Sequence, residues 1–310
     1  MYKVFIDGKE GTTGLQIYDR FSKRNDIELI NISEENRKDV LKRKECINNS
    51  DITFLCLPDI AAKESVGLIE NDNVKIIDAS TAHRTNSDWA YGFPELSEIF
   101  RNNIKNSSRV AVPGCHASGA ISLIYPLISG GLVKNDYPFV IHSITGYSGG
   151  GKKMIAEYES SNRNYELKSP RQYALSLNHK HLPEIKTICN LSYNPIFNPI
   201  VADYYSGMCV TVPIYTRLMS RIISLKEMIN YFSSYYKGQN FVKINNDSSN
   251  VTLLSANKLS GKNNMEINIC GNDEQILLTS RFDNLGKGAS GAAIQCMNIM
   301  LGIDETTSLI

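Results

Sequence analysis

The strongest constraint on the fold is an alternation of apolar runs and polar helical stretches over the first 112 residues. Strand-like runs occupy residues 3–7, 28–32, 52–57, 75–79 and 109–112, and helical patterns occupy 13–23, 37–45 and 60–69. Strands that alternate with helices favour βαβ units around a parallel sheet. This part of the sequence therefore predicts a doubly wound nucleotide-binding domain.

The remainder of the chain has a different pattern. Extended runs rich in β-branched and aromatic residues occupy 139–145, 200–201, 208–215, 251–254, 265–270 and 275–280. Short connections between several of them favour a mostly antiparallel sheet. Residues 288–301 carry apolar side chains at helical spacing and end at Gly302. The expected fold is an α/β Rossmann domain plus an α+β domain with a mostly antiparallel sheet.

Composition excludes several classes of function. A chain of 310 residues is long enough for roughly two domains. The 33 basic and 32 acidic residues give a net charge of +1, which predicts no nucleic-acid partner. Seven cysteines without a CxxC spacing argue against a disulfide framework and a zinc site, so we expect no metal. Prolines and glycines interrupt the apolar stretch 110–133, and no leader precedes the first strand, which together predict a cytoplasmic protein without membrane association.

A glycine-rich turn follows the first strand and opens the first helix. Its spacing, GxxGxxG over residues 8–14, is a variant of the dinucleotide fingerprint. Glycines let the backbone approach a pyrophosphate, which binds the free N–H groups of the helix start. A plain tight turn is the alternative, but the place of this segment in a βαβ pattern favours a cofactor site. The expected contacts are Gly8, Gly11, Thr12, Thr13 and Gly14.

The end of the second strand bears on the choice of cofactor. An NAD site would carry an acidic residue there, for the ribose 2′-hydroxyl. The chain instead has Asn31 and Ser33, with the basic residues Arg37 and Lys38 beyond. Ser33 and Arg37 could receive a 2′-phosphate, which favours NADP(H) over NAD. A solvated basic helix face is the alternative interpretation.

Cys115 is the candidate nucleophile. It follows a strand and the turn Pro113-Gly114 and stands at the start of a predicted helix. The helix dipole and unpaired N–H groups there stabilise a thiolate, and they can lower a thiol pKa from about 8.5 to roughly 3.5–7.5. Most cysteines are buried apolar residues, an interpretation that suits Cys56, Cys209 and Cys296.

A nucleophilic thiol needs a proton acceptor or a partner that holds it as thiolate. His179 and His181 lie two residues apart, and Glu184 could orient one of them. A surface turn capped by Pro183 is the alternative. His116 follows Cys115 directly but is expected to point elsewhere on the helix.

Two further segments are candidates for binding an anionic substrate or phosphate. The glycine-rich loop at 146–153 offers Ser148, Gly149, Gly150 and Lys152. The strand at 75–79 ends at the edge where ligands gather in open α/β sheets. It is followed by Arg84 and Glu95 as candidate substrate contacts and by Ser80 as a candidate cofactor contact. The alternatives are a flexible linker for the loop and a structural turn for the segment after the strand.

Taken in order, these segments resemble the shorter form of the N-acetyl-gamma-glutamyl-phosphate reductase family of arginine biosynthesis. The matching residues are 6–15, 56–59, 78–84, 91–96, 113–119, 146–152, 179–184 and 283–291. The resemblance implies an NADP-binding Rossmann domain at 1–114, completed by a helix within 285–310, and a catalytic and oligomerisation domain at 115–284. It places Asn284 and Gly288 near the nicotinamide, and it implies a homodimer or homotetramer.

The resemblance also implies a reaction. The Cys115 thiolate would attack N-acetyl-L-glutamyl 5-phosphate and expel phosphate, and NADPH would reduce the thioester to N-acetyl-L-glutamate 5-semialdehyde. His179 or His181 would move the proton. One rival is an aspartate-semialdehyde dehydrogenase, which also reduces an acyl phosphate. The other is a nicotinamide-binding redox sensor without turnover, in which Cys115 is only oxidised and reduced.

Overall fold

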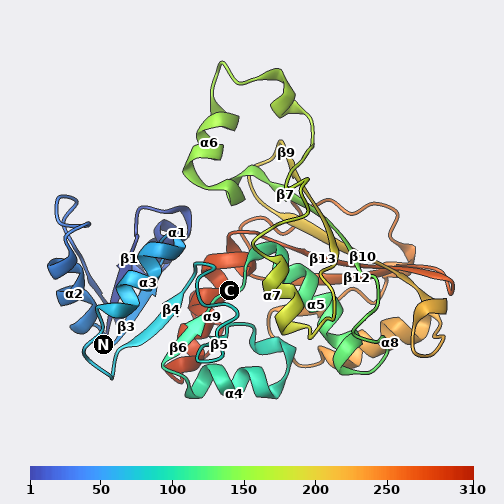
Figure 1. The fold of residues 1–310 in the computed structure, drawn as a ribbon, viewed down its shortest axis with the longest axis horizontal. Helices are drawn as coiled ribbons and strands as arrows, with labels where there is room; N and C mark the ends of the chain where they lie inside the picture. The colour runs from blue at the N-terminus through green and yellow to red at the C-terminus, as the bar shows by residue number, and fades with distance from the viewer. The chain divides into compact units, whose positions relative to one another are not determined.

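The computed structural model describes residues 1–310, apart from the side chain of Ser249. The chain forms two compact units (Figure 1). Unit 1 comprises Met1–Pro113 and Ala289–Ile310, and unit 2 comprises Gly114–Gly288. Each unit is built around its own sheet, and each is described below by itself.

Unit 1 contains a parallel sheet with the strand order β2-β1-β3-β4-β6-β5. Its strands are β1 (Tyr2–Asp7), β2 (Ile27–Ile30), β3 (Ile52–Leu55), β4 (Lys75–Asp78), β5 (Ala90–Tyr91) and β6 (Arg109–Ala111). Its helices are α1 (Thr12–Phe21), α2 (Val40–Asn48), α3 (Asp59–Gly67), a 3₁₀ turn (Pro94–Leu96), α4 (Glu98–Asn106) and α9 (Gly291–Met300). The predicted doubly wound parallel sheet is confirmed. Because β1 lies between β2 and β3, the strand order reverses at β1, where such sheets bind ligands.

Helix α9 brings the end of the chain into unit 1. Every residue of α9 is buried, because it packs against α4 and β4. Polar side chains also hold it in place: Gln295 Nε2 donates to Glu95 Oε1 at 2.9 Å, and Asn298 Oδ1 accepts from Arg24 at 3.0 Å. The C-terminal helix is thus an internal part of the nucleotide-binding unit.

Unit 2 contains a mixed sheet with the order β11-β12-β13-β10-β7-β9-β8. Its strands are β7 (Val140–Gly146), β8 (Arg171–Gln172), β9 (Ile196–Ala202), β10 (Met208–Tyr215), β11 (Val242–Ile244), β12 (Met265–Gly271) and β13 (Gln275–Phe282). The pairs β11/β12 and β7/β9 are parallel and the others are antiparallel. The expected mostly antiparallel sheet is confirmed.

One strand prediction is wrong. Residues 251–254 read as a β-branched run, but among the described residues they pair with no strand. The sheet edge beside β12 is already occupied by β11 (Val242–Ile244), which the sequence pattern did not indicate. Residues 251–254 therefore form a loop, and Leu253 is exposed to solvent.

With one exception, the α-helices of unit 2 cover one face of its sheet. They are α5 (Cys115–Ser129), α6 (Gly151–Glu159), α7 (Leu182–Ile188) and α8 (Leu225–Tyr235). Helix α5 packs on β10 and β13, α7 packs on α5, and α8 packs on β11 and β12. The opposite side, here called the open sheet face, exposes apolar side chains of four strands: Ile144, Ile196, Tyr215 and Leu277. Helix α6 projects from the rest of the unit beyond β7 and β9 (Figure 1).

Within the described part of the chain, no helix combines the length and the apolar character that crossing a bilayer requires.

The hydrogen bond that a proline inside α5 cannot donate is replaced by one from a tyrosine at the C-terminal end of α8. Pro126 has no N–H, so the carbonyl of Ser122 lacks its usual helical donor. Tyr236 Oη donates to that carbonyl at 2.8 Å. We expect Tyr236→Phe to lower the free energy of unfolding by about 1–3 kcal/mol, because it leaves this buried acceptor unsatisfied. Urea titration measures the loss.

The matched control is Tyr193→Phe, which removes an exposed hydroxyl from the same unit. It should change the free energy of unfolding by less than about 0.5 kcal/mol. Equal stabilities of the two variants would contradict the role assigned to Tyr236.

Candidate active site

Cys115 is the first residue of α5, as the sequence predicts. Gly114 caps the helix with an extended backbone, and its carbonyl accepts the N–H of Ser118 at 2.7 Å. The cysteine is half-buried. The N–H groups of the first helical turn have no partner within the helix and carry its positive end charge. That charge favours the thiolate form of Cys115 over the thiol.

Glu184 holds the turn in front of Cys115. It lies in the first turn of α7, is 1% exposed, and accepts the Gly114 N–H on Oε1 at 2.8 Å. The sequence suggested that Glu184 orients a histidine. That role stays a prediction, and the bond to Gly114 fixes the peptide immediately before Cys115.

Gly288 and Asn284 lie in unit 2 with the nucleophile. A Cβ on Gly288 would be 3.0 Å from the Cβ of Cys115, so any side chain there would force its neighbours to shift by a few tenths of an ångström. Asn284 accepts the Gly207 N–H at 2.8 Å and donates to Ser148 Oγ at 2.9 Å. These contacts connect the end of β13 to the loop after β7. The predicted nicotinamide contacts of Asn284 and Gly288 remain predictions.

Three histidines form a cluster beside the start of α5. The ring centroids of His179 and His181 are 4.7 Å apart, and those of His116 lie 5.8 Å and 5.7 Å from them. Tyr173 completes the group, 6.0 Å from His179. The sequence singled out His179 and His181 but missed His116 and Tyr173. Helical geometry argued against His116, and Tyr173 stands in no motif, so only the folded chain identifies both.

Burial keeps two of these imidazoles, those of His116 and His179, neutral at neutral pH. It lowers the pKa of His116 to about 3, and the charges of His179 and Lys180 add to the effect. It lowers the pKa of His179 to about 4, with a smaller contribution from Lys180. At neutral pH neither ring therefore supplies a positive charge to hold the thiolate. The positive end of α5 stabilises a thiolate without depending on the charge of these two rings.

The tautomer of His179 follows from one backbone contact. Its Nδ1 lies 3.2 Å from the N–H of His181 and accepts from it. A neutral imidazole that accepts on Nδ1 carries its hydrogen on Nε2. His179 therefore presents a hydrogen-bond donor at Nε2.

The loop after β7 is held rigidly. It forms a 3₁₀ turn (Tyr147–Gly150) that leads into α6. The N–H groups of Tyr147 and Ser148 donate to the carbonyls of Tyr204 and Tyr205 at 3.0 Å and 2.9 Å. Ser148 Oγ is buried beside Asn284, whereas Lys152 is exposed on the first turn of α6. Substrate contacts by Ser148, Gly149, Gly150 and Lys152 remain predictions.

The three candidates after β4 have partners inside unit 1. Arg84 donates to the carbonyls of Val112 and Ala79 at 2.8 Å and 3.1 Å. Glu95 accepts from Gln295, and Ser80 Oγ donates to Asp78 at 2.8 Å. The two bonds of Arg84 hold the carboxyl ends of β4 and β6 together. These contacts give no support to substrate contacts by Arg84 and Glu95 or to a cofactor contact by Ser80, which stay predictions.

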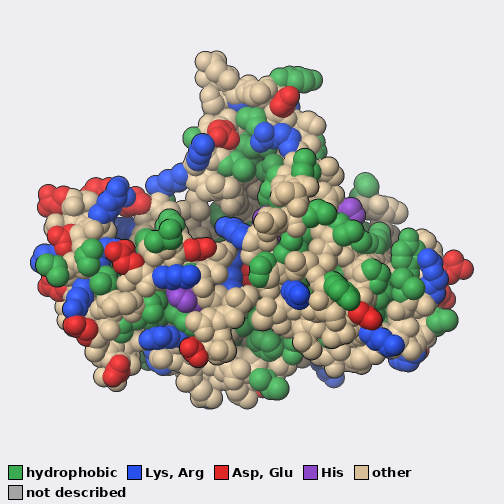
Figure 2. Space-filling view, in the orientation of Figure 1, with side chains coloured by type: hydrophobic (Ala, Val, Ile, Leu, Met, Phe, Trp, Pro, Cys, Tyr) green, Lys and Arg blue, Asp and Glu red, His purple; other side chains and the backbone are tan. Residues whose placement is uncertain are grey.

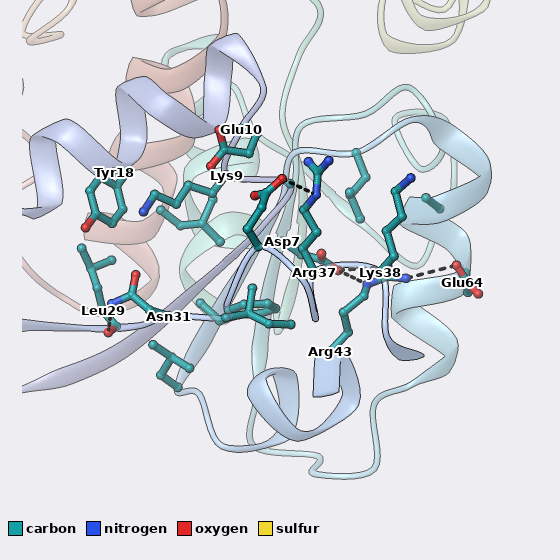
Figure 3. A pocket seen from close by; sticks show the side chains of 18 residues that line it. Asp7, Lys9, Glu10, Tyr18, Leu29, Asn31, Arg37, Lys38, Arg43 and Glu64 are labelled. Carbon is teal, nitrogen blue, oxygen red and sulfur yellow. Dashed lines mark hydrogen bonds and ion pairs between the residues drawn. The ribbon is translucent and has the colours of Figure 1, made fainter. Parts of the chain in front are cut away.

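A cavity of about 620 Å³ opens at the carboxyl ends of β1 and β2 in unit 1 (Figure 3). Gly8 lines it with φ +87°, a conformation that disfavours any side chain. Arg37 also lines it, and its contact with the cofactor stays a prediction. Gly11 caps α1, and Thr12, Thr13 and Gly14 form the first turn of that helix. Ser33 lines a separate cavity of about 340 Å³ instead.

Basic side chains gather in the larger cavity. Lys9 extends over the ring of Tyr18, with Nζ 3.5 Å from its centroid (Figure 3). Lys38 lines the cavity, and Arg37 is paired with Glu34 at 2.8 Å. The sequence indicated Arg37 and Lys38 through their charge, but Lys9 counted only as a member of the glycine-rich turn. Cavity and charges together fit the anionic phosphates of a dinucleotide.

Arg43 is the buried cation of this cavity. Its guanidinium lies 3.1 Å from Asp7 and 3.3 Å from Glu64 (Figure 3). Ser65 Oγ donates to the same Asp7 oxygen at 2.8 Å. This network ties α2 and α3 to the end of β1. Elsewhere on the visible face of unit 1, acidic and basic side chains are interspersed (Figure 2).

Comparison with known families assigns both units. Residues 9–107 match the family described as "Semialdehyde dehydrogenase, NAD binding domain", and residues 115–284 match "Semialdehyde dehydrogenase, dimerisation domain". The fold agrees with crystal structures of aspartate semialdehyde dehydrogenases. The Vibrio cholerae enzyme II gives a TM-score of 0.71 at 13% identity over 97% of this chain and 98% of that one. The Francisella tularensis enzyme gives 0.71 at 16% identity over 97% and 100%.

Two relatives are more similar in sequence. The N-acetyl-gamma-glutamyl-phosphate reductase of Burkholderia ambifaria is 43% identical over 97% of this chain and 96% of its own length. The N-acetyl-gamma-glutamyl-phosphate reductase 2 of a Nostoc species is 41% identical over 99% of both chains. The resemblance inferred from the sequence is confirmed.

Proposed function

The chain belongs to the N-acetyl-gamma-glutamyl-phosphate reductase family, and we propose that it reduces N-acetyl-L-glutamyl 5-phosphate to N-acetyl-L-glutamate 5-semialdehyde and phosphate with NADPH. The observation that carries this proposal is the position of Cys115. It combines a helix start, a glycine that leaves space against its Cβ, and a neighbouring group of neutral histidines. Those features suit a nucleophile that must attack and later leave an acyl carbon.

The residues of unit 2 divide the chemistry between them. The Cys115 thiolate attacks the acyl carbon, and phosphate leaves as the thioester forms. Bound nicotinamide supplies the hydride that reduces this carbon to the aldehyde level. His179 donates a hydrogen bond from Nε2 to a substrate oxygen, and the buried His181 is the second candidate for moving the proton.

The function is tested by running the reaction backwards. N-acetyl-L-glutamate 5-semialdehyde should reduce NADP⁺ only when phosphate is present. If the protein oxidised aspartate semialdehyde but not N-acetyl-L-glutamate 5-semialdehyde, the result would support an aspartate-semialdehyde dehydrogenase. No turnover of either aldehyde, despite cofactor binding, would support the redox sensor.

The cofactor site is proposed to prefer NADP(H). Asn31 stands where an NAD site would carry an acidic side chain, and Lys9, Arg37 and Lys38 line the adjacent cavity. The 2′-phosphate can replace Glu34 as the partner of Arg37, because a phosphate offers more charge to a guanidinium than a carboxylate does. Ser33, in its own cavity, is a weaker candidate than these cations.

We expect Arg37→Ala to weaken NADPH binding by about 10- to 100-fold, the loss typical of a charge-assisted hydrogen bond. NADH binding should change little, because NADH lacks the 2′-phosphate. Titration of cofactor fluorescence gives both dissociation constants. The matched control is Lys42→Ala, an exposed cation of the neighbouring cavity that is paired with Glu45. An equal loss for NADPH and NADH would refute the 2′-phosphate assignment.

The protein is further proposed to act in the cytoplasm as a homodimer or homotetramer. Unit 2 matches a dimerisation domain, and its open sheet face leaves apolar side chains uncovered. A second copy of this chain is the simplest partner for such a surface.

We expect Leu277→Arg to dissociate the oligomer, because a cation on the open sheet face would be buried without a partner. Light scattering after size exclusion should then report the mass of a single chain. Leu218→Arg is the matched control: it has the same 47% exposure but lies outside the sheet. Retention of the oligomer by Leu277→Arg would exclude the open sheet face as the interface.

A further inference from the structure

A chain of three hydrogen-bonded side chains runs past the nucleophile in unit 2. Ser143 Oγ lies 2.6 Å from Nδ1 of His116, and Nε2 of His116 lies 2.7 Å from the hydroxyl of Tyr173. His116 is the residue after Cys115. The backbone of Tyr173, the last of the three residues, is fixed beside β9, because its N–H donates to the carbonyl of Pro199 at 3.1 Å.

The direction of these bonds follows from Ser143. Its hydroxyl is 0% exposed, and among the described residues His116 Nδ1 is its one hydrogen-bond partner. A buried hydroxyl that donates to nothing is costly, so Ser143 donates and Nδ1 accepts. His116 is neutral because burial lowers its pKa to about 3. A neutral ring that accepts on Nδ1 carries its hydrogen on Nε2 and donates it to the Tyr173 oxygen.

This direction leaves the Tyr173 hydroxyl hydrogen available. In the described part of the chain, His116 is the one hydrogen-bond partner of that hydroxyl, and Tyr173 uses the bond as acceptor. The hydroxyl lies close to the reacting region, because its partner His116 directly follows Cys115 in the chain. Burial raises the pKa of Tyr173, and the charge of Cys115 raises it further. The phenol therefore stays protonated and can donate to a substrate atom bound beside the sulfur.

We propose that Tyr173 is a catalytic residue that donates a hydrogen bond to the acyl oxygen while the substrate is bonded to Cys115, and that His116 and Ser143 are positioning residues that orient this donor. This role of Tyr173 depends on the function proposed above in one respect: an acyl group must become bonded to the sulfur of Cys115.

The electrons balance without a proton transfer from Tyr173. A sulfur lone pair forms the C–S bond, and the carbonyl π pair moves to oxygen, where the phenol hydrogen stabilises the new negative charge. That pair returns to re-form the carbonyl as the bond to the leaving group breaks. Hydride addition to the thioester creates a second oxyanion, and the Tyr173 hydroxyl stabilises it in the same way. When this oxyanion re-forms a carbonyl, the C–S bond breaks and the Cys115 thiolate leaves.

Two reactions of Cys115 separate this role from a general effect on the thiol. Acetylation by p-nitrophenyl acetate passes through an oxyanion, whereas alkylation by iodoacetamide does not. We expect Tyr173→Phe to slow acetylation about 100-fold, as loss of an oxyanion donor does, and to leave alkylation unchanged within about twofold. Tyr165→Phe, which removes an exposed hydroxyl from the same unit, should change neither rate.

Each other outcome overturns the proposal. An equal loss in both reactions would mean that Tyr173 supports the thiolate, and no loss in either would mean that it takes no part. Because neither reagent requires NADPH or an acyl phosphate, the result does not depend on the substrate proposed above. Failure of the reverse assay with intact acetylation would refute that substrate and leave the role of Tyr173 standing.

A double-mutant comparison tests whether the hydrogen bonds from Ser143 through His116 to Tyr173 act as one unit. Ser143→Ala keeps the packing but removes the donor that fixes the His116 tautomer, so Tyr173 can turn its hydrogen toward Nε2. We expect acetylation to slow by about 3- to 10-fold in the otherwise unchanged protein and by less than about 1.5-fold in the Tyr173→Phe background. Equal losses in the two backgrounds, or none in either, would refute the positioning role.

Discussion

Replacing Cys115 with serine should reduce turnover by at least about 10⁴-fold, the scale seen when an enzyme loses its nucleophile. A serine hydroxyl is not ionised at neutral pH, and neither His116 nor His179 is basic enough to ionise it, because burial lowers the pKa of each ring. NADPH affinity should persist, since Cys115 does not line the cavity of unit 1. Steady-state kinetics and a cofactor titration on one preparation measure both quantities.

Cys270→Ser provides the control, because Cys270 is also a half-buried thiol of unit 2. It should retain activity within about twofold, as exchanges away from the chemistry usually do. Residual turnover of the Cys115 variant above one per cent would remove the basis of the thioester mechanism. Mass spectrometry of the wild-type protein with substrate but without NADPH should show the acyl adduct on Cys115 and on no other cysteine.

A methyl group on Gly8 should disable the nucleotide-binding unit. Gly8 has φ +87°, and a Cβ there would lie 2.4 Å from the carbonyl oxygen of Cys56 at the end of β3. The left-handed conformation and the overlap with backbone together should cost at least about 3 kcal/mol in Gly8→Ala. We also expect more than about tenfold weaker NADPH binding, because the turn lines the cavity and cannot keep its geometry. Urea unfolding and cofactor titration measure these losses.

Gly67→Ala is the matched control at the end of α3. A Cβ at this position meets no atom of the described residues within 4 Å. Its stability should be unchanged or up to about 1 kcal/mol higher, because alanine favours a helix more than glycine does. If both variants bound NADPH like the wild type, the turn after β1 would not be part of the cofactor site.

The sequence predicted the parts of the fold that depend on local pattern. Residues 2–7 and the glycine turn after them form a strand and a helix start, as their periodicity and glycine spacing indicate. Cys115 begins a helix because Pro113 and Gly114 break the preceding strand. Each of these conclusions depends on a few neighbours in the chain.

Features that depend on tertiary packing could not be read in this way. His116 was set aside because a helix directs consecutive side chains apart, yet the turn before His179 and the strand β9 bring Tyr173 and His179 to its ring. Ser33 was favoured from its place after β2, but the folded chain turns it into a different cavity from Lys9. Residues 251–254 pair with no described strand, and β11 (Val242–Ile244) pairs with β12 where no local pattern indicated a strand.

The bond between Glu184 and Gly114 has a consequence for how the active site can vary. The helix that carries Glu184 begins directly after His179 and His181, so one short segment supplies both the imidazoles and the acceptor that fixes the nucleophile's turn. A shift of α7 therefore moves His179, His181 and the Cys115 thiol together. The distance between the imidazoles and the sulfur is preserved when the helix is displaced. Substitutions that tilt α7 as a rigid body should be tolerated far better than those that break this one bond.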